Sequence, residues 1–490
     1  MGDHPLAIRL CEPGSITGRY AALSYCWGGS LPIKLDSSTA PGLKSKIELD
    51  LLPRTFQDAI YVCQRLSIRY LWIDSLCIFQ DDVEDWEEES AKMGSYYENA
   101  FIVIAATSCP NADTPFLKAV DEMWMSKELD ISGPGITRGE SRLYVRELEH
   151  QKIDMFAALG PLSTRGWAWQ ENILARRVVH YTRSEILWEC RCGIISQIPR
   201  KNGRGFSQML KEQDLDLNTG WHHLVVAYSR RELTFRKDKL PSISGVASKI
   251  LNQTNSPYVA GHWVAWLPGD LVWGTTGWAG NCALVSQMDA PPLYIDTGVP
   301  SWSWASVDRH ISWECVDYAS IARVEAVHCT VPGRNPLGIV TDGYIVLTGP
   351  VIRFKIQSTS STWKKYVWPK YILMQEGFQT TIDVNPDTLL CPCYAPTSSG
   401  LQPSVERAKD YLVPVLDELD HEVFCIVLCK EVPYLIDRLS PRPRLTIPVF
   451  VCMVLGRSSK TPGAYTRLTL SWFSDEERLT TAENMTVKIV

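Results

Sequence analysis

The sequence predicts an α/β fold in which helices flank a parallel sheet, followed by a helical segment and a β-rich C-terminal domain. Apolar runs of strand length lie near residues 20–25, 70–74 and 101–106. None shows the alternation of polar and apolar residues that is typical of a strand with one solvent-exposed face. Helix-period segments separate these runs. Strands that are apolar on both faces and alternate with helices are typical of a parallel sheet covered by helices.

The composition is that of an ordinary globular protein, with 490 residues, 45% hydrophobic and 21% charged. A formal net charge of -6 and the absence of a long Lys/Arg block argue against a nucleic-acid partner. No stretch reaches the roughly 20 consecutive apolar residues of a membrane helix, and the first residues lack the apolar run of a signal peptide. We therefore expect a cytoplasmic protein without a membrane partner.

The length exceeds that of a single hydrophobic core, so several domains are expected. We place an α/β domain at residues 1–200, a helical or mixed region at 201–319 and a β-rich domain at 320–490. Beyond residue 320 the pattern changes to short apolar runs, for example 422–431, separated by Pro, Gly and Ser.

The helices and hairpins follow from local periodicity. Segment 53–67 places Phe56, Ala59 and Cys63 on one helical face after Pro53, and segment 82–100 has apolar residues on one side and acids on the other. Residues 176–193 predict a hairpin with its turn at 182–185, in which His180 is a plain strand residue.

Further along, the pattern predicts two helices joined by a turn within residues 203–255. The tryptophan-rich stretch 300–308 predicts a strand edge.

Ligands of parallel sheets bind beyond the carboxyl ends of the strands, which places candidate ligand-binding residues after the first two strands. Asp74 is either a cap for the following turn or a catalytic carboxylate, and one residue can serve as both. The other candidates at these ends are Ser24, Tyr25, Trp27, Gly28, Ser75 and Gln80.

Residues 163–177 form a second polar and aromatic cluster. Arg165 can bind a phosphate or carboxylate through both arms of its guanidinium, Trp167 offers a stacking face, and Gln170 and Glu171 can contact a ribose or an amide. The alternative is an Arg165–Glu171 ion pair at a helix N-terminus capped by Ser163 or Thr164, with the tryptophans as packing.

The sequence predicts no metal site and no tightly bound cofactor. The 15 cysteines are odd in number and mostly stand in apolar contexts, and the close pairs Cys190/Cys192 and Cys391/Cys393 lack further ligands at zinc-finger spacing. We interpret them as structural thiols. No P-loop, dinucleotide-binding, zinc-protease or nucleophile-elbow motif is present.

Segments 20–29, 52–108 and 163–190 resemble, in order and spacing, the three conserved blocks of the fungal heterokaryon incompatibility (HET) domain. Later segments, including 300–308, are similar to those that follow this domain, so the resemblance spans about residues 15–310. Several proteins of the family trigger cell death when unlike hyphae fuse. The resemblance also implies a likeness to TIR domains, which are flavodoxin-like and in some cases cleave NAD.

The TIR likeness implies a catalytic glutamate on the helix that follows an apolar strand, one turn beyond a tryptophan. Here Trp86 precedes Glu87, Glu88 and Glu89, and Glu89 is the nearest match, one position short of the expected spacing. These acids are otherwise a solvated helix face. One carboxylate beside the ribose suffices to stabilise the cation formed when nicotinamide leaves.

Three function classes remain at this stage. The chain is an incompatibility protein with an active site for NAD or another small molecule, an enzyme recruited to a natural-product pathway, or a signalling module that acts through a protein partner or self-association. If it is an enzyme, we expect Asp74, Glu89, Arg165 and Glu171 to converge on one concave site.

Overall fold

The computed structural model divides the chain into two compact units. Unit 1 comprises residues 1–215, 231–234 and 241–247, and unit 2 comprises 216–230, 235–240 and 248–490. The structure describes residues 7–12, 14, 17–29, 31–118, 127–129, 143–145, 160–196, 216–275, 298–313, 318–363, 366–378, 382–384, 396–397, 400–401, 422–431 and 448–490. Part of the predicted segment 203–255 and the pair Cys391/Cys393 lie outside these residues.

Unit 1 contains a six-stranded sheet in the order β2-β1-β3-β6-β7-β8. The strands β1 (Tyr20–Ser24), β2 (Tyr70–Trp72) and β3 (Ile102–Ala105) are parallel, as predicted, with β1 between the other two. Strand β6 (Arg177–Tyr181) also pairs parallel to β3.

The antiparallel strands β7 (Ile186–Cys190) and β8 (Gly193–Ser196) complete this sheet. The predicted hairpin around residues 182–185 is therefore present. A separate short hairpin joins β4 (Lys127–Leu129) and β5 (Leu143–Val145).

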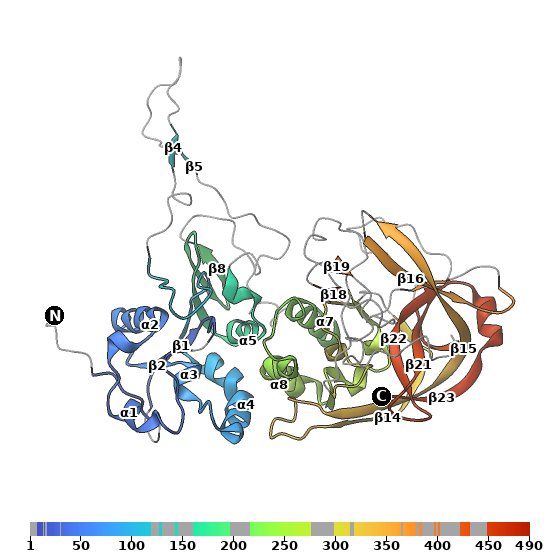
Figure 1. Cartoon of the computed structure of the whole chain (residues 1–490), viewed down its shortest axis with the longest axis horizontal. Coiled ribbons are helices and arrows are strands. Elements are labelled where there is room, and N and C mark those ends of the chain that lie inside the picture. The colour runs from blue at the N-terminus through green and yellow to red at the C-terminus, as the bar shows by residue number, and fades with distance from the viewer. Residues whose placement is uncertain are drawn as a thin grey trace, which may run out of the picture. The chain divides into compact units, whose positions relative to one another are not determined.

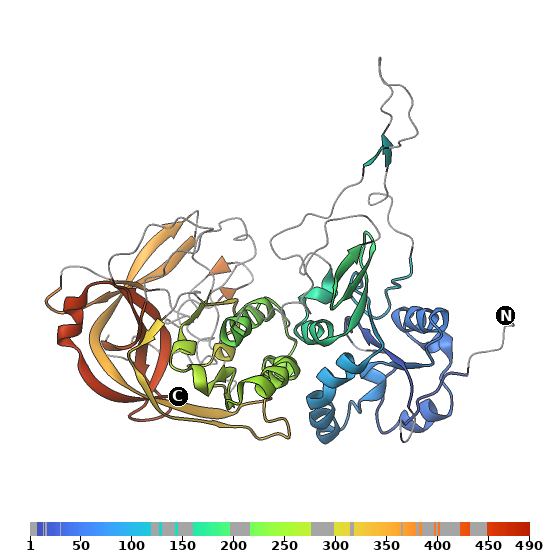
Figure 2. The same cartoon turned by 180° about the vertical axis from the view of Figure 1, so that it is seen from behind.

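Helices cover both faces of the sheet, with α2 and α4 on opposite sides of it (Figures 1 and 2). The helices α1 (Ala40–Ser45) and α2 (Arg54–Arg65) pack on one face, and an exposed 3-10 turn (Leu49–Leu51) lies between them in the chain. The helices α4 (Val83–Asn99) and α5 (Gly166–Leu174) cover the other face.

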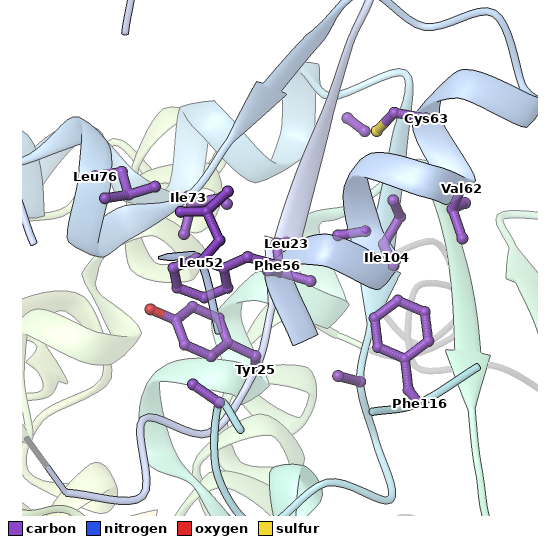
Figure 3. Close-up of a cluster of buried hydrophobic side chains, with 14 of the residues drawn as sticks. Leu23, Tyr25, Leu52, Phe56, Val62, Cys63, Ile73, Leu76, Ile104 and Phe116 are labelled. Atoms are coloured by element: carbon purple, nitrogen blue, oxygen red, sulfur yellow. The ribbon is translucent and has the colours of Figure 1, made fainter. Parts of the chain in front are cut away.

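Helix α2 shows why the periodicity predicts its packing. It buries Phe56, Ala59 and Cys63 at helical spacing. The rings of Phe56 and Tyr25 pack edge to face, with their centroids 5.0 Å apart (Figure 3). Since a fully buried aromatic or aliphatic side chain contributes about 1.5–3 kcal/mol, this apolar stripe is what attaches α2 to the sheet.

The apolar run 70–74 does not form a strand along its whole length. Strand β2 ends at Trp72, and Asp74 begins a short helix, α3 (Asp74–Cys77). The Asp74 carboxylate accepts a hydrogen bond of 2.6 Å from the Ser75 backbone N–H, the local pairing by which aspartate favours a turn over a continuing strand. Asp74 therefore satisfies a neighbouring N–H of the turn, as expected, but it does not cap the helix, because Ile73 is the residue that precedes α3 and no side chain caps it.

Unit 2 begins with α7 (Leu217–Tyr228), and α8 (Ser244–Thr254) straddles the division between the units. The stretch 300–308 was expected to be a strand edge, but residues Trp304–Ser306 form a 3-10 turn instead. The Ser303 hydroxyl accepts from the Ala305 N–H and donates to the Ala260 carbonyl, a local bonding pattern that competes with strand pairing. Trp302 and Trp304 are fully buried there.

Between α8 and the C-terminal sheet lie short elements that pack around the tryptophans. They are β9 (Tyr258–Val259), β10 (His262–Trp263), β11 (Trp273–Thr275), β12 (Ile311–Trp313) and the 3-10 turns Val264–Trp266 and Gly269–Leu271. Two further 3-10 turns, Arg236–Asp238 and Pro241–Ile243, precede α8.

The C-terminal part of unit 2 is a nine-stranded sheet, in agreement with the predicted β-rich domain. The 22-residue strand β15 pairs with both β20 and β23, which closes β15, β20, β21, β22 and β23 into a ring (Figure 1). Closure leaves fewer unpaired edges. The strands are β13 (Tyr318–Ser320), β14 (Arg323–Thr330), β15 (Asp342–Trp363), β16 (Tyr366–Met374), β17 (Ile382–Val384), β20 (Glu422–Glu431), β21 (Phe450–Arg457), β22 (Tyr465–Phe473) and β23 (Glu483–Ile489), with a turn at Glu476–Thr481 and a separate pair β18 (Pro396–Thr397) and β19 (Gly400–Leu401).

Candidate functional site

The candidate site lies beyond the carboxyl end of β1, where the chain turns sharply. Gly28 has a φ of +73°, and a Cβ there would lie 2.0 Å from the Cβ of Asn111 in the loop after β3. Only glycine fits this close approach without displacing the neighbouring loop. The turn after β1 therefore packs directly against the loop that follows β3.

Two hydrogen bonds connect the end of β1 to the end of β2. The Trp27 indole N–H donates to Asp74 Oδ2 at 2.8 Å, and the Tyr25 hydroxyl donates to the Ser75 hydroxyl at 2.9 Å. Ser75 is fully buried, whereas Asp74 and Trp27 are partly buried. The indole plane is thus held in one orientation beside a carboxylate at the surface of the cluster.

Helix α5 supplies the remaining charges. Arg165 immediately precedes the helix, and its guanidinium donates to the Tyr25 carbonyl at 2.8 Å. Two turns further on, Glu171 accepts a short hydrogen bond from the Ser24 hydroxyl. Ser24 is fully buried and Glu171 is 6% exposed, so this pair lies beneath Asp74 and Arg165.

The electrostatics of the cluster are those of two carboxylates sharing one cation. Burial raises the pKa of Glu171 to about 7, against the opposing effect of the Ser24 hydroxyl, and the Asp74 charge adds to the rise while Arg165 opposes it. Burial also raises the pKa of Asp74, with Trp27, Tyr25 and Arg165 in opposition. A carboxyl group that titrates near neutral pH is suited to acid–base chemistry.

Residues 20–171 match the family model described as heterokaryon incompatibility protein (HET). The match begins at the first residue of β1 and ends at Glu171, so it includes every side chain of the cluster. The chain carries a HET domain. No curated protein and no solved structure matches the chain.

Glu89 lies outside the cluster in the HET domain. Its carboxylate accepts a hydrogen bond of 2.6 Å from the Tyr96 hydroxyl and one of 3.0 Å from Lys92, both on the same helix α4. Lys92 also contacts Glu88 at 2.6 Å. The structure thus groups Asp74, Arg165 and Glu171, and it gives Glu89 partners of its own along α4.

Three further candidate ligand-binding residues, Gln170, Gln80 and Trp167, make contacts within the protein. Gln170 is 1% exposed, and its side-chain oxygen accepts from the Gly245 N–H at 2.7 Å. Gln80 is partly buried and donates to the Ile78 carbonyl at 2.9 Å. Trp167 is partly buried and packs on the core between α4, α5 and the sheet.

The alternative interpretation of residues 163–177 is confirmed for the tryptophans, since Trp169 is buried and Trp167 packs on the core, but it is wrong about the cap and the direct ion pair. The residue that precedes α5 is Arg165, without a side-chain cap, and Ser163 and Thr164 belong to a 3-10 turn (Pro161–Thr164). Arg165 bonds to the carbonyl of Tyr25, the residue that follows β1, rather than directly to Glu171. The Arg165 charge lowers the pKa of Glu171 by electrostatic attraction, without a hydrogen bond between the two side chains.

Unit 1 also contains a buried histidine, beyond the matched residues, that the sequence interpretation treated as a plain strand residue. His180 is 4% exposed, and its Nε2 lies 3.2 Å from a carboxylate oxygen of Glu189, which is 3% exposed. The other ring nitrogen lies 3.4 Å from the Thr107 hydroxyl. The sequence signal that could have found this pair is the position of a histidine and a glutamate, nine residues apart, on the two strands of the predicted hairpin, where their side chains can meet.

His180 is on the same sheet face as the cluster. Ser24 pairs with Ala105, and Ala105 pairs with His180, so the three side chains point to one side of the sheet. The small Ala105 side chain separates the Ser24–Glu171 pair from the His180–Glu189 pair.

A groove of about 380 Å³ lies at the N-terminal end of α2, apart from the carboxylate cluster. Its walls are Pro32, Asp50, Leu51, Leu52, Pro53, Arg54, Gln57 and Asp113. Among the residues with described positions, no group of three or more His, Cys, Asp or Glu side chains could hold a metal ion. In the same part of the chain, no helix is long and apolar enough to cross a membrane.

Proposed function

We propose that the HET domain is a hydrolase for a nucleotide-type small molecule, with NAD as the candidate substrate, and that its products trigger an incompatibility response in the cytoplasm. The observation that carries the proposal is the convergence of Asp74, Arg165 and Glu171 at the carboxyl end of β1, with a carboxyl pKa raised to about 7. The strand order β2-β1-β3 supports it, because flavodoxin-like sheets share this order and bind ligands at such ends.

In this proposal Glu171 is the principal carboxylate. Loss of nicotinamide leaves positive charge on the ribose, and an ionised carboxylate held in a water-poor site stabilises that charge strongly. Asp74 orients a ribose hydroxyl, Arg165 binds the diphosphate, and the Trp27 indole, fixed by its bond to Asp74, stacks on a planar ring. Activity then rises with pH through about 7, as Glu171 ionises.

The test is nicotinamide release from NAD by the purified protein. Glu171→Gln should lower turnover by about two or more orders of magnitude, a barrier increase of roughly 3 kcal/mol, with substrate binding little changed. Glu88→Gln is the matched control on an exposed helix face, and full activity is expected. Glu89→Gln distinguishes the acid implied by the TIR likeness from Glu171.

If Glu171→Gln and Asp74→Asn keep full activity, or the wild-type protein releases no nicotinamide, this proposal is overturned. A loss that appears only in Glu89→Gln would move the active site to α4. The same variants, expressed in a fungal host, show whether killing follows the enzymatic activity. Candidate natural-product metabolites in the same assay test recruitment to a biosynthetic pathway.

A second candidate function is a non-catalytic module that acts through a protein partner or self-association. The observation in its favour is burial, since Ser24, Ser75, Gln170 and Glu171 are each at most 6% exposed and have hydrogen-bond partners within the protein. In that case Glu171→Gln changes stability and leaves killing unaltered.

A further inference from the structure

The tight turn between β7 and β8 brings two cysteines together. Cys190 is the last residue of β7 and pairs with Gly193, the first residue of β8, so only Arg191 and Cys192 form the turn. Cys190 is partly buried and Cys192 is exposed. Because β7 runs antiparallel to β6, this turn lies at the opposite end of the sheet from the carboxylate cluster.

The surroundings of the Cys190 sulfur favour its thiolate. Although burial by itself raises the pKa of Cys190, hydrogen bonds from the Cys192 backbone, the Trp188 side chain, the Cys192 thiol and the Gly193 backbone oppose it, and the net effect lowers the pKa. Arg191 contacts Glu98 at the end of α4, at 3.8 Å, which ties the turn to that helix.

Other cysteines of the chain have the opposite environment. Burial raises the pKa of Cys63 and Cys77 to about 12 and that of Cys109 to about 11. The same cause raises the pKa of Cys26, Cys329, Cys425 and Cys429. Such thiols are inert, because the thiolate is the nucleophile in exchange reactions.

We propose that Cys190 and Cys192 form a redox-active dithiol that is oxidised to an intramolecular disulfide by low-molecular-weight disulfides such as oxidised glutathione. The Cys190 thiolate attacks one sulfur of the small disulfide, and a mixed disulfide forms as one thiolate leaves. The Cys192 thiol loses its proton and attacks the Cys190 sulfur, which expels the second small thiol. The two protein thiols are oxidised, and one small disulfide is reduced to two thiols.

A disulfide across a single intervening residue is strained, and strained disulfides are readily reduced and serve as labile or regulatory bonds. The dithiol is therefore a reversible modification site rather than a structural crosslink. The chemistry of the dithiol does not involve the carboxylate cluster. A test of the dithiol is therefore independent of a test of the proposed hydrolase.

The experiment treats the full-length protein with oxidised glutathione and measures peptide masses, with a protease that spares Arg191. The wild-type peptide should lose two hydrogen masses, and dithiothreitol should restore them. In Cys192→Ser the glutathione should remain attached to Cys190, because no second thiol is present to displace it. Cys190→Ser should form its adduct at Cys192 several-fold more slowly.

The exposed Cys11 is the control within the same chain, and it should carry glutathione without forming an internal bond. The proposal is overturned if the peptide holding both cysteines stays fully reduced under conditions that modify Cys11. It is also overturned if wild-type protein accumulates a stable glutathione adduct at Cys190 with Cys192 free.

Discussion

At the scale of single residues, Glu171 is held in an environment that opposes its charge. It is 6% exposed, and burial together with the Asp74 carboxylate raises its pKa from 4.5 to about 7, despite the Ser24 hydroxyl and Arg165. A rise of this size corresponds to about 3 kcal/mol. Such a cost is typical of functional sites, where a strained electrostatic arrangement is retained for its chemistry.

The pH dependence of stability follows from this pKa. Between about pH 4.5 and about pH 7 the folded protein binds more protons at Glu171 than the unfolded chain does, so stability falls as pH rises and stays lower above pH 7. Glu171→Gln imitates the protonated acid. Thermal or denaturant unfolding should show this variant to be more stable than wild type at pH 8, by up to about 3 kcal/mol, and equal to it near pH 4.5.

A Glu171→Gln variant that is less stable than wild type at pH 8 would contradict this account. It would mean that the ionised carboxylate stabilises the fold. Glu88→Gln, on the exposed face of α4, is the control, and because it removes only an exposed ion pair with Lys92 its stability should differ from wild type by less than about 1 kcal/mol at either pH.

At the scale of elements, α4 approaches α8 through two glycines. A Cβ at Gly94 would lie 3.0 Å from the Cα of Gly245, and a Cβ at Gly245 would lie 2.8 Å from the Gln170 side-chain oxygen. The Gly245 N–H donates to that same oxygen, so Gln170 joins the start of α8 to α5, next to Glu171. The helices can pack this closely only because neither position carries a side chain.

Two glycine-to-alanine variants separate helix propensity from packing. Alanine is favoured over glycine by about 1 kcal/mol within a helix. Gly42 in α1 has nothing within 4 Å of its Cβ position, so Gly42→Ala should stabilise unit 1 by up to about 1 kcal/mol. Gly94→Ala should destabilise it by about 1–3 kcal/mol, because the contact is with backbone that cannot yield easily.

Denaturant unfolding of both variants measures the difference. If Gly94→Ala stabilises the protein as Gly42→Ala does, then α4 and α8 do not pack as closely as described.

At the scale of the whole molecule, each unit has a core of its own. The core of unit 1 lies on the two faces of the parallel sheet, and that of unit 2 includes the ring of strands around β15. Unit 2 also contains a buried polar bridge in which Asp270, fully buried, accepts from His262 at 2.7 Å and from His222. The His222 ring stacks on Trp313 at 4.3 Å.

Asp270→Asn should therefore destabilise unit 2 selectively. Each imidazole contacts its own carboxylate oxygen, whereas the asparagine amide has a single acceptor oxygen and places its NH₂ group against an N–H donor. We therefore expect the free energy of unfolding to fall by about 3 kcal/mol. Hydrogen exchange followed by mass spectrometry should show faster exchange in α7 and β10–β12 and unchanged protection in β1 and β3. Asp308→Asn, at an exposed ion pair with Arg236, is the control and should have little effect.

Uniform loss of protection in both units would contradict the prediction, because the two cores would then unfold as one cooperative structure.

The sequence by itself determined the parallel strands β1, β2 and β3, the helix α2, the β6–β7 hairpin and the β-rich C-terminal part. These features rest on local periodicity, which records how apolar residues are distributed along one strand or helix. It also placed Asp74, Arg165 and Glu171 among the candidates, because strand ends and polar clusters are visible along the chain.

Only the tertiary structure decided which of these side chains meet. Glu171 reaches Ser24 across 147 positions, whereas Glu89, on a helix just beyond β2, bonds to Tyr96 seven positions away. The rotation of a helix about its own axis and the register between distant strands depend on long-range packing, which no local pattern specifies. The same long-range packing buries His180 against Glu189, and within the tryptophan-rich stretch 300–308 residues Trp304–Ser306 form a 3-10 turn instead of a strand.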